Sequence, residues 1–409
     1  MKRIFSVLFA FLLCGLWACV WENPSNDITF LPLDDSEYPY AEVPRLVIET
    51  EDLQEIRNRE DKIPAKLQIY GVESPSSSVL GITIKGRGFS SFEMPKYSYK
   101  IEFNEKISLF DFPKNRDFVL IANFRDKSHL KNFITYKLAN NLGDDFSPKS
   151  KFVELYLNRK YEGLYLLTES IKVGNQRVKI AKNDSSFLFE KTTPPSNRPS
   201  FQTSNKNLFE IRYPKDVSQQ SFNLLKNHIN SFELLIKNNA TLSLDSLNQW
   251  LDIDDFIRYY WIQEFSKNYD GRFLRSIFLT WEKGGPIKMG PVWDFDLAYG
   301  IHRTGTSTPE GWLIRDSGWN KWLWKNDAFA KKAQLYWRNN YPKIEFMTDS
   351  IETFGKLIQR AIKNDNKRWP VLNTSENKYH ETSYESYLDA IDSLKAWCSQ
   401  RSKWIDSHL

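Results

Sequence analysis

Residues 290–300 read Gly-Pro-Val-Trp-Asp-Phe-Asp-Leu-Ala-Tyr-Gly and set two carboxylates, Asp294 and Asp296, between aromatic side chains. Residues 287–293 have the pattern of a strand, and Gly300 closes the turn that follows it. Carboxylates two positions apart at the end of a strand suit Mg²⁺, which takes oxygen ligands from one or two carboxylates and from substrate phosphates. The alternative interpretation is a solvated turn in which both aspartates bond only to nearby backbone.

A third aspartate precedes this stretch, in residues 264–272, which read Glu-Phe-Ser-Lys-Asn-Tyr-Asp-Gly-Arg. A helix is predicted to end near Ser266 and to leave Asn268 and Asp270 in a loop before a strand at 276–281. The order of a loop aspartate, a hairpin and a second aspartate is that of kinase-type phosphoryl transfer. There, one aspartate orients the acceptor hydroxyl and the other holds the metal. Alternatively, Asp270 and the following glycine form a plain turn.

The two halves of the chain differ in their hydrophobic pattern. The first half predicts one helix at 127–142 among short strands at 46–50, 65–70, 98–103, 152–157 and 163–167. The second half is mostly helical, with helices predicted at 216–238, 245–266, 325–365 in pieces, and 383–406. This pattern predicts an α+β fold of two lobes, in which a β-rich N-terminal lobe (43–190) and a loop (191–210) precede a helix-rich C-terminal lobe (211–409).

Three positions in the β-rich half could serve a phosphorylated ligand. Arg87 lies in the glycine- and serine-containing segment 85–91, whose backbone amides could approach phosphate. Lys100 lies on a predicted strand, where it either grips phosphate or faces solvent, and segment 85–91 could equally be a plain β-turn. Glu169 ends another strand, where a connection between the lobes would begin.

The N-terminus has the pattern of an export signal. Two basic residues precede a short apolar run at 4–13, and Leu16-Trp17-Ala18-Cys19 resembles the lipobox of bacterial lipoproteins. We expect a signal peptide (1–18), a lipid on Cys19 and a polar tether (19–42), which would place the protein in the cell envelope, periplasmic or surface-exposed, anchored to the membrane. Plain secretion and an uncleaved anchor are the alternatives.

The composition argues against several other classes of protein. The formal net charge is only +5 for 56 basic and 51 acidic residues, so no nucleic-acid partner is expected. The five histidines and three cysteines have no zinc-site spacing, and no Gly-x-Ser-x-Gly nucleophile motif occurs. The sequence gives no indication of oligomeric state.

Taken together, four blocks of sequence resemble the CotH kinase-like family. They are residues 85–101, residues 122–132, residues 161–169, and Asn268-Tyr269-Asp270 combined with residues 290–300. The resemblance implies an atypical protein-kinase-like fold that uses ATP and Mg²⁺ or Mn²⁺ to phosphorylate Ser, Thr or Tyr hydroxyls of exported proteins. It also implies that Asp270 is the catalytic aspartate and Asp294 a metal ligand, with Asp296 as a second ligand, and that Arg87, Lys100 and Glu169 line the nucleotide cleft.

One position departs from the kinase pattern and keeps a second hypothesis open. Protein kinases place an asparagine five residues after the catalytic aspartate to help hold the second metal ion. Here that position is Arg275, followed by Ser276, which favours a one-metal site or an inactive pseudokinase. The alternative function is therefore a non-catalytic surface lipoprotein that binds glycan or protein through aromatic residues such as Trp312, Trp319, Trp322 and Trp324.

Overall fold

The computed structural model describes residues 30–71, 79–144, 146–300, 307–375 and 382–409. The described residues from Asp34 to Leu409 belong to one compact unit. The predicted signal peptide and Cys19 lie outside the described residues. Within the described ranges, no helix combines the length and the apolar character needed to cross a bilayer.

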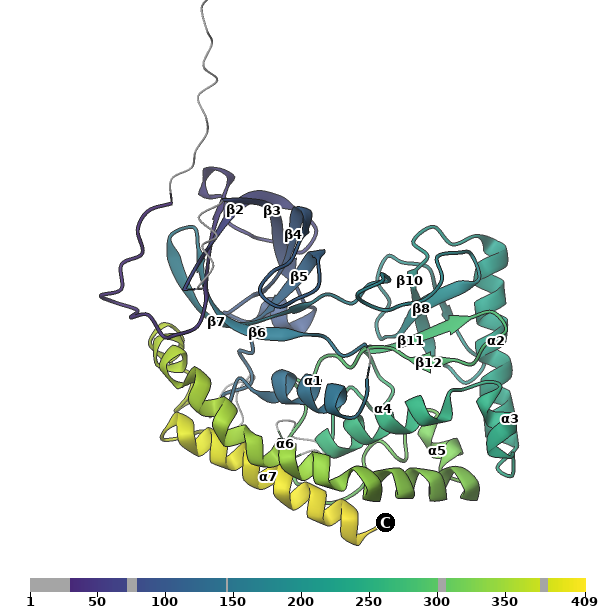
Figure 1. The fold of residues 1–409 in the computed structure, drawn as a ribbon. Helices are drawn as coiled ribbons and strands as arrows, with labels where there is room; N and C mark the ends of the chain where they lie inside the picture. The colour runs from purple at the N-terminus through teal and green to yellow at the C-terminus, as the bar shows by residue number, and fades with distance from the viewer. Residues whose placement is uncertain (1–29, 72–78, 145, 301–306, 376–381) are drawn as a thin grey trace, which may run out of the picture. The chain divides into compact units, whose positions relative to one another are not determined.

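Seven strands of the N-terminal part close into a barrel (Figure 1). Neighbouring strands are antiparallel, except that the first strand pairs with β6 in parallel. Helix α1 (Lys131–Asn141) lies between β5 and β6 in the chain. In spatial order the strands are β1 (Arg45–Thr50), β2 (Ile63–Tyr70), β3 (Leu80–Arg87), β4 (Ser98–Ile107), β5 (Asn115–Ile121), β7 (Lys160–Glu169) and β6 (Ser150–Leu157).

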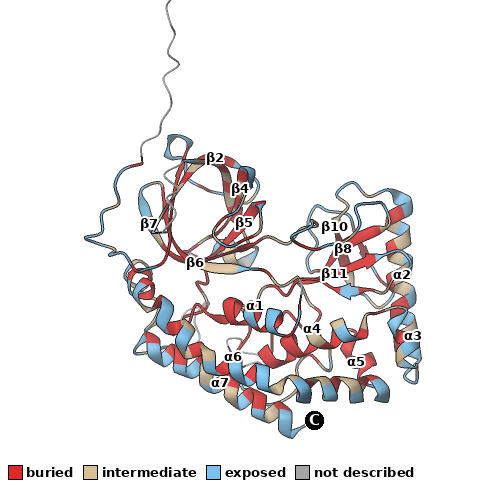
Figure 2. Ribbon diagram, in the orientation of Figure 1, coloured by how far each residue is buried: buried red, intermediate tan, exposed pale blue. Residues whose placement is uncertain are grey.

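The barrel forms around side chains that alternate along its strands. On β2, Ile63, Ala65 and Leu67 are buried while the residues between them are more exposed, and Ile82 and Ile84 repeat the pattern on β3. Successive side chains of a strand point to opposite faces, so this period of two supplies one apolar face to the barrel interior. Figure 2 shows the buried residues along these strands.

A second sheet, which the interpretation of the sequence underestimated, is formed by strands between residues 186 and 289. Its five antiparallel strands lie in the order β12 (Lys288–Met289), β11 (Ile277–Glu282), β8 (Ser186–Lys191), β10 (Leu208–Tyr213) and β9 (Ser200–Gln202). The segment predicted as a loop, 191–210, therefore contains β9 and the start of β10. The strand predicted at 287–293 pairs over only two residues. The proposed division of the chain into lobes at this segment stays a prediction.

Five of the helices in the second half of the chain begin at capping residues that their sequences offer. Ser218, Ser243, Asp252, Asn326 and Ser386 each accept a backbone hydrogen bond at the helix start, as expected of N-cap residues. The helix predicted in pieces is one helix of 42 residues that contains Pro342. The helices are α2 (Gln219–Asn238), α3 (Leu244–Asn248), α4 (Ile253–Ser266), α5 (Asn320–Leu323), α6 (Asp327–Arg368) and α7 (Tyr387–Ser407). The predicted α+β class, with β-rich and helical parts in that order, is confirmed.

Candidate active site

The loop that carries Asp270 is fixed by the end of α4. Lys267 adopts a left-handed conformation (φ 44°) and ends the helix, which turns the chain toward residues 294–297. The backbone N–H of Asn268 then donates to Gln263 O at 3.2 Å, and that of Tyr269 donates to Leu297 O at 3.1 Å. The Asp270 loop is thus bonded directly to the stretch that follows Asp294.

Asp294 sits in a backbone conformation that side chains rarely adopt. Its φ is +68°, in the left-handed region, and such strain persists only where neighbouring contacts hold it. Ser276 Oγ donates to its carboxylate at 2.8 Å, and Asn268 Nδ2 donates to its carbonyl at 3.1 Å. The first contact fixes the direction of the Asp294 carboxylate, and the second fixes its backbone.

Asp296 is held from the other half of the chain, by Asn132 on α1. Asn132 Nδ2 donates to Asp296 Oδ1 at 2.7 Å, and Asn132 Oδ1 accepts the backbone N–H of Phe295 at 3.0 Å. One asparagine side chain therefore fixes both the backbone and the second carboxylate of the acidic motif.

The three carboxylates lie close enough to affect one another's ionisation. Burial, with the charge of Asp294 adding to it and Arg275 opposing it, raises the pKa of Asp270 to about 7. Burial and, after it, the charge of Asp294 together raise the pKa of Asp296 to about 6. Like charges that share a site disfavour full ionisation, so an added cation would be stabilised here.

The oxygen atoms at this site fit a hard divalent cation that takes some of its ligands from the protein and the others from a phosphate group. In the described ranges, no three or more Asp, Glu, His or Cys side chains are arranged to hold a metal ion by themselves. Mg²⁺ commonly uses one or two carboxylates and completes its shell with water and substrate phosphates, so a smaller carboxylate set suffices. The side chains at this site offer oxygen donors, and the amide oxygen of Asn268 is buried without a hydrogen-bond partner among the described residues.

Arg87 reaches this acidic site from the barrel. It is the last residue of β3, and its guanidinium lies 4.8 Å from the centre of the Trp293 ring, which stacks on Tyr136. Burial lowers the pKa of Arg87, and the charge of Asp294 opposes this shift. The segment predicted as a loop, 85–91, begins inside β3 and ends in a short 3₁₀ helix (Ser90–Glu93).

Lys100 and Glu169 have partners elsewhere on the barrel. Lys100 Nζ lies 3.0 Å from Asp117 Oδ1. Glu169, the last residue of β7, pairs with Arg177 and accepts the backbone N–H of Lys149 at 3.0 Å. Their expected role at a nucleotide therefore stays a prediction.

The sequence did not indicate the contacts that several residues make at this site. Asn132 lies in the block 122–132 that resembled the kinase-like family, but nothing near it in sequence indicated its partner Asp296. Arg275, which stands where kinases carry asparagine, has its Nε 3.5 Å from Asp270 Oδ1. Ser276, the next residue, donates a hydrogen bond to the Asp294 carboxylate. The two residues at the position where kinases differ thus contact the two aspartates.

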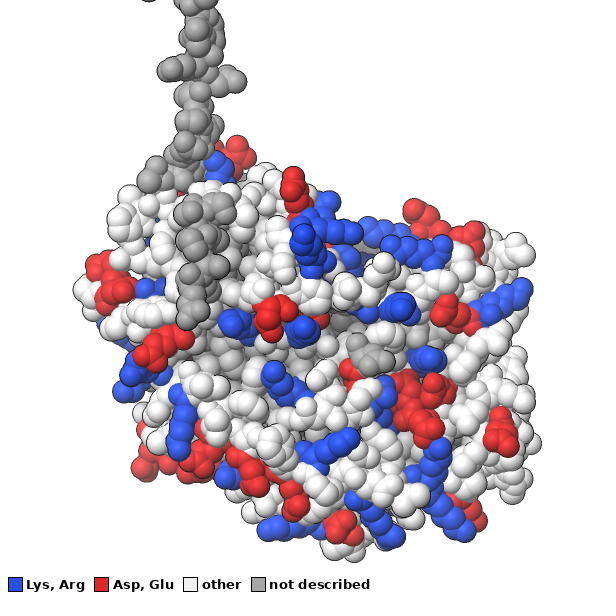
Figure 3. Space-filling view, viewed as in Figure 1, with Lys and Arg blue, Asp and Glu red and all other residues white. Residues whose placement is uncertain are grey.

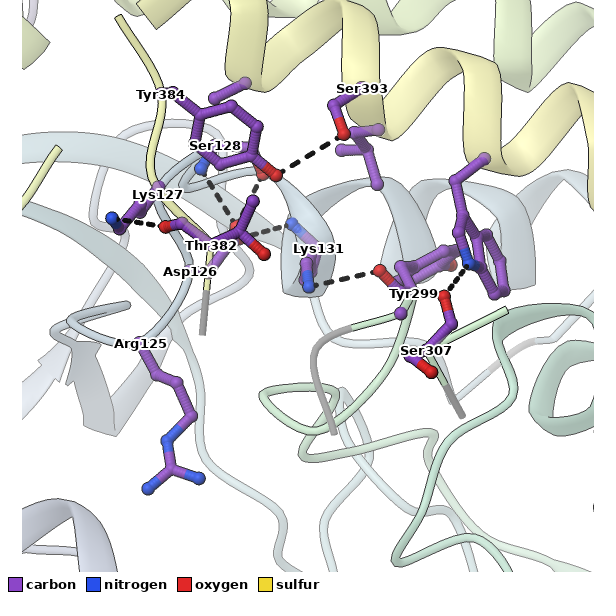
Figure 4. A pocket seen from close by; sticks show the side chains of 14 residues that line it. Arg125, Asp126, Lys127, Ser128, Lys131, Tyr299, Ser307, Thr382, Tyr384 and Ser393 are labelled. Atoms are coloured by element: carbon purple, nitrogen blue, oxygen red, sulfur yellow. Dashed lines mark hydrogen bonds between the residues drawn. The ribbon is translucent and has the colours of Figure 1, made fainter. Parts of the chain in front are cut away.

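A pocket of about 190 Å³ lies on the far side of the acidic motif, between the start of α1 and helix α7 (Figure 4). None of the predicted site residues lines it. Its Lys131 donates to Ala298 O at 2.8 Å and to Tyr299 O at 3.4 Å. Asp126 accepts the backbone N–H of Lys131 at 2.8 Å. The pocket residues thus hold the chain directly after Asp296.

Comparison with known proteins agrees with this geometry. The family described as "CotH kinase protein" matches residues 82–405 of the chain. The chain is also similar to the inner spore coat protein H of Bacillus subtilis (strain 168), with 23% identity over 378 residues, which cover 89% of this chain and 96% of that protein. The matched range includes all three aspartates and most of the barrel. The chain belongs to the CotH kinase protein family.

Proposed function

We propose that this protein is a two-lobed, kinase-like enzyme that transfers phosphate from ATP to Ser, Thr or Tyr hydroxyls of proteins. The observation that carries this proposal is that Asp270, Asp294 and Asp296 lie close enough for the charge of one to raise the pKa of another. Family membership supports kinase-type chemistry for this arrangement. In such chemistry, positioning and charge stabilisation do most of the work.

Asp270 would act on the acceptor hydroxyl. A general base works best when its pKa is near the operating pH, and the pKa of Asp270 is raised to about 7. At neutral pH a large fraction of Asp270 is ionised and can accept the proton of the hydroxyl as it attacks. Arg275, 3.5 Å away, orients this carboxylate and limits the rise in its pKa.

Asp294 and Asp296 would hold Mg²⁺ or Mn²⁺ together with the phosphates of ATP. When bound, the cation supplies charge neutralisation for the transferred phosphoryl group. Arg87 would add positive charge from the barrel side, since the charge of Asp294 stabilises its guanidinium. Lys100 and Glu169 would contribute to the nucleotide cleft.

The cellular setting of the proposal is the cell envelope. The name of the Bacillus relative places that protein in the inner spore coat. The N-terminal pattern of this chain favours export and a lipid on Cys19. The acceptors would then be other exported proteins.

The packing of the tryptophans gives little support to glycan binding in the alternative function, a non-catalytic surface lipoprotein that binds glycan or protein. Trp319 and Trp324 are buried, and Trp322 is half-buried against the core. Trp312 packs edge-on against Trp404, with ring centres 4.9 Å apart. The rings of Trp319 and Trp324 lie in the core, and those of Trp312 and Trp322 are partly covered by it, so the four rings do not form one flat exposed platform for a sugar.

Phosphate transfer by the purified full chain tests the proposal. The chain is incubated with γ-labelled ATP, Mn²⁺ or Mg²⁺ and casein as a general acceptor, and labelled Ser, Thr and Tyr are counted. We expect transfer by the wild type and a loss of about a thousandfold in Asp294→Asn, because the developing charge loses its stabilisation. Asp349→Asn, at an exposed position on α6, is the matched control and should retain full activity.

Two results would contradict the proposal. One is the absence of both nucleotide binding and transfer in a wild type that unfolds cooperatively on heating. The other is transfer by Asp294→Asn at the wild-type rate.

A further inference from the structure

Asn268 has a feature that its role as a loop residue does not explain. Its side chain is 2% exposed, yet its amide oxygen has no hydrogen-bond partner within the described part of the chain. Buried polar atoms are almost always paired, and leaving one unpaired costs free energy. A structure that tolerates such an atom often uses it for a ligand.

The Asn268 side chain lies between the two acidic loops. Its backbone N–H is fixed by Gln263 O, and its Nδ2 donates to Asp294 O at 3.1 Å. Asp270 follows two positions later in the same loop. The unpaired oxygen belongs to the same carboxamide group, so it lies next to the backbone of Asp294.

Neighbouring polar side chains lack this free oxygen. Asn132 uses both of its amide atoms, one for Asp296 and one for the backbone of Phe295. The Ser276 hydroxyl donates to the Asp294 carboxylate. Asn268 therefore offers a neutral amide oxygen in addition to the charged oxygens of the carboxylates. Mg²⁺ and Mn²⁺ accept such an oxygen as a ligand.

We infer that the amide oxygen of Asn268 is a ligand of the divalent cation held by Asp294, and that it replaces the asparagine absent at position 275. This inference rests on the proposed function. In this chain the asparagine ligand would come two residues before the catalytic aspartate, Asp270. In protein kinases it comes five residues after the catalytic aspartate.

Mn²⁺ binding to the purified full chain tests this assignment without relying on activity. Binding is measured by electron paramagnetic resonance, with and without a non-hydrolysable ATP analogue. We expect Asn268→Ala to weaken Mn²⁺ binding at least tenfold. Asn268→Asp should bind as tightly as the wild type or more tightly, because it keeps an oxygen at the same place.

The aspartate variant separates a ligand from a positioning residue. It removes the Nδ2 donor to Asp294, so equal losses in Asn268→Ala and Asn268→Asp would show that Asn268 only positions Asp294 and would overturn the inference. Asn320→Ala is the matched control, because Asn320 also has a buried, unpaired amide oxygen but lies in an apolar pocket. Its Mn²⁺ affinity should not change.

The same series distinguishes this inference from the proposed function. Wild-type affinity in Asn268→Ala, with binding lost in Asp294→Asn, would overturn the inference alone. A wild type that binds no Mn²⁺ under either condition would overturn both. Thermal unfolding of each variant checks that a loss of binding does not reflect a loss of fold.

Discussion

Two clusters of buried charge in this protein follow opposite rules. In the first, Lys96 Nζ lies 2.5 Å from Asp365 Oδ1 and donates to Leu164 O at 2.7 Å. The same carboxylate accepts the backbone N–H of Leu164 at 2.7 Å, and His129 Nε2 lies 3.5 Å from its other oxygen. Every charge here meets an opposite charge or a hydrogen-bond partner, and the cluster ties β7 to α6.

In the second cluster, the negative charge of Asp294 raises the pKa values of both Asp270 and Asp296. Arg275 and Arg272 offset only part of the negative charge around Asp270. We call the first cluster matched, because each charge has an opposite charge or a hydrogen-bond partner, and the second unmatched, because negative charge is in excess. A matched cluster holds the fold together. An unmatched cluster lowers stability and is typical of a site that binds a ligand or catalyses a reaction. Figure 3 shows Lys, Arg, Asp and Glu mixed over the visible surface. The difference between the two clusters therefore concerns charges in the interior.

The largest effect is expected from breaking the matched cluster. Lys96→Ala should lower the free energy of unfolding by about 3 kcal/mol, because it leaves the Asp365 carboxylate buried without its cation. Lys96 is 1% exposed, so water cannot take its place. Urea unfolding followed by tryptophan fluorescence measures the change.

A double variant sharpens this prediction. Lys96→Met combined with Asp365→Leu removes both charges, and we expect it to be more stable than Lys96→Ala alone. The opposite order of stabilities would mean that packing around Lys96, and not its charge, holds β7 against α6.

The elements that the sequence predicted are those whose signals are local. Helices α4 and α7 carry apolar residues at helical spacing behind a capping residue, and β11 is a compact run of β-formers. Barrel closure is different, because it depends on the parallel pairing of β1 with β6. Those strands lie about a hundred residues apart, and no short pattern encodes such a contact. Strand β5 and the continuity of α6 across Pro342 were missed for a similar reason, since packing decided both.

The residues of the candidate site also differ in whether local sequence could indicate them. Asp270 and Asp294 could be proposed as site residues because each lies in a distinctive stretch with a glycine and aromatic residues nearby, and their roles stay predictions. Asn132 and Asp296 are 164 residues apart, and Lys96 and Asp365 are 269 residues apart. Partnerships at such separations follow from the folded topology, so only the structure could assign them.

A smaller effect, of opposite sign, is expected at the unmatched cluster. The pKa of Asp270 is raised from 3.8 to about 7, so the native state binds more protons than the unfolded chain between these values. This carboxyl therefore favours folding at low pH, and its contribution is lost as the pH rises through about 7. Asp270→Asn should raise the free energy of unfolding at pH 8 by roughly 2 kcal/mol and change it little at pH 4.

Urea unfolding of both proteins at the two pH values measures this difference. Asp349→Asn, at an exposed position, should show no pH-dependent gain. If Asp270→Asn were less stable than the wild type at pH 8, the site would hold Asp270 by favourable contacts, and the contrast between the two clusters would fail.

The smallest effect isolates burial as the cause of the contrast. Lys62 and Glu102, on adjacent parts of the barrel surface, form an ion pair at 2.6 Å, nearly the same distance as the 2.5 Å between Lys96 and Asp365. Their side chains are 51% and 23% exposed, so water screens the pair and replaces each lost partner. Lys62→Ala should therefore cost about 0.5 kcal/mol in low salt and nothing measurable in about 1 M salt. The loss in Lys96→Ala should persist in both. An equal loss from the two substitutions would mean that contact distance, and not desolvation, sets the strength of these pairs.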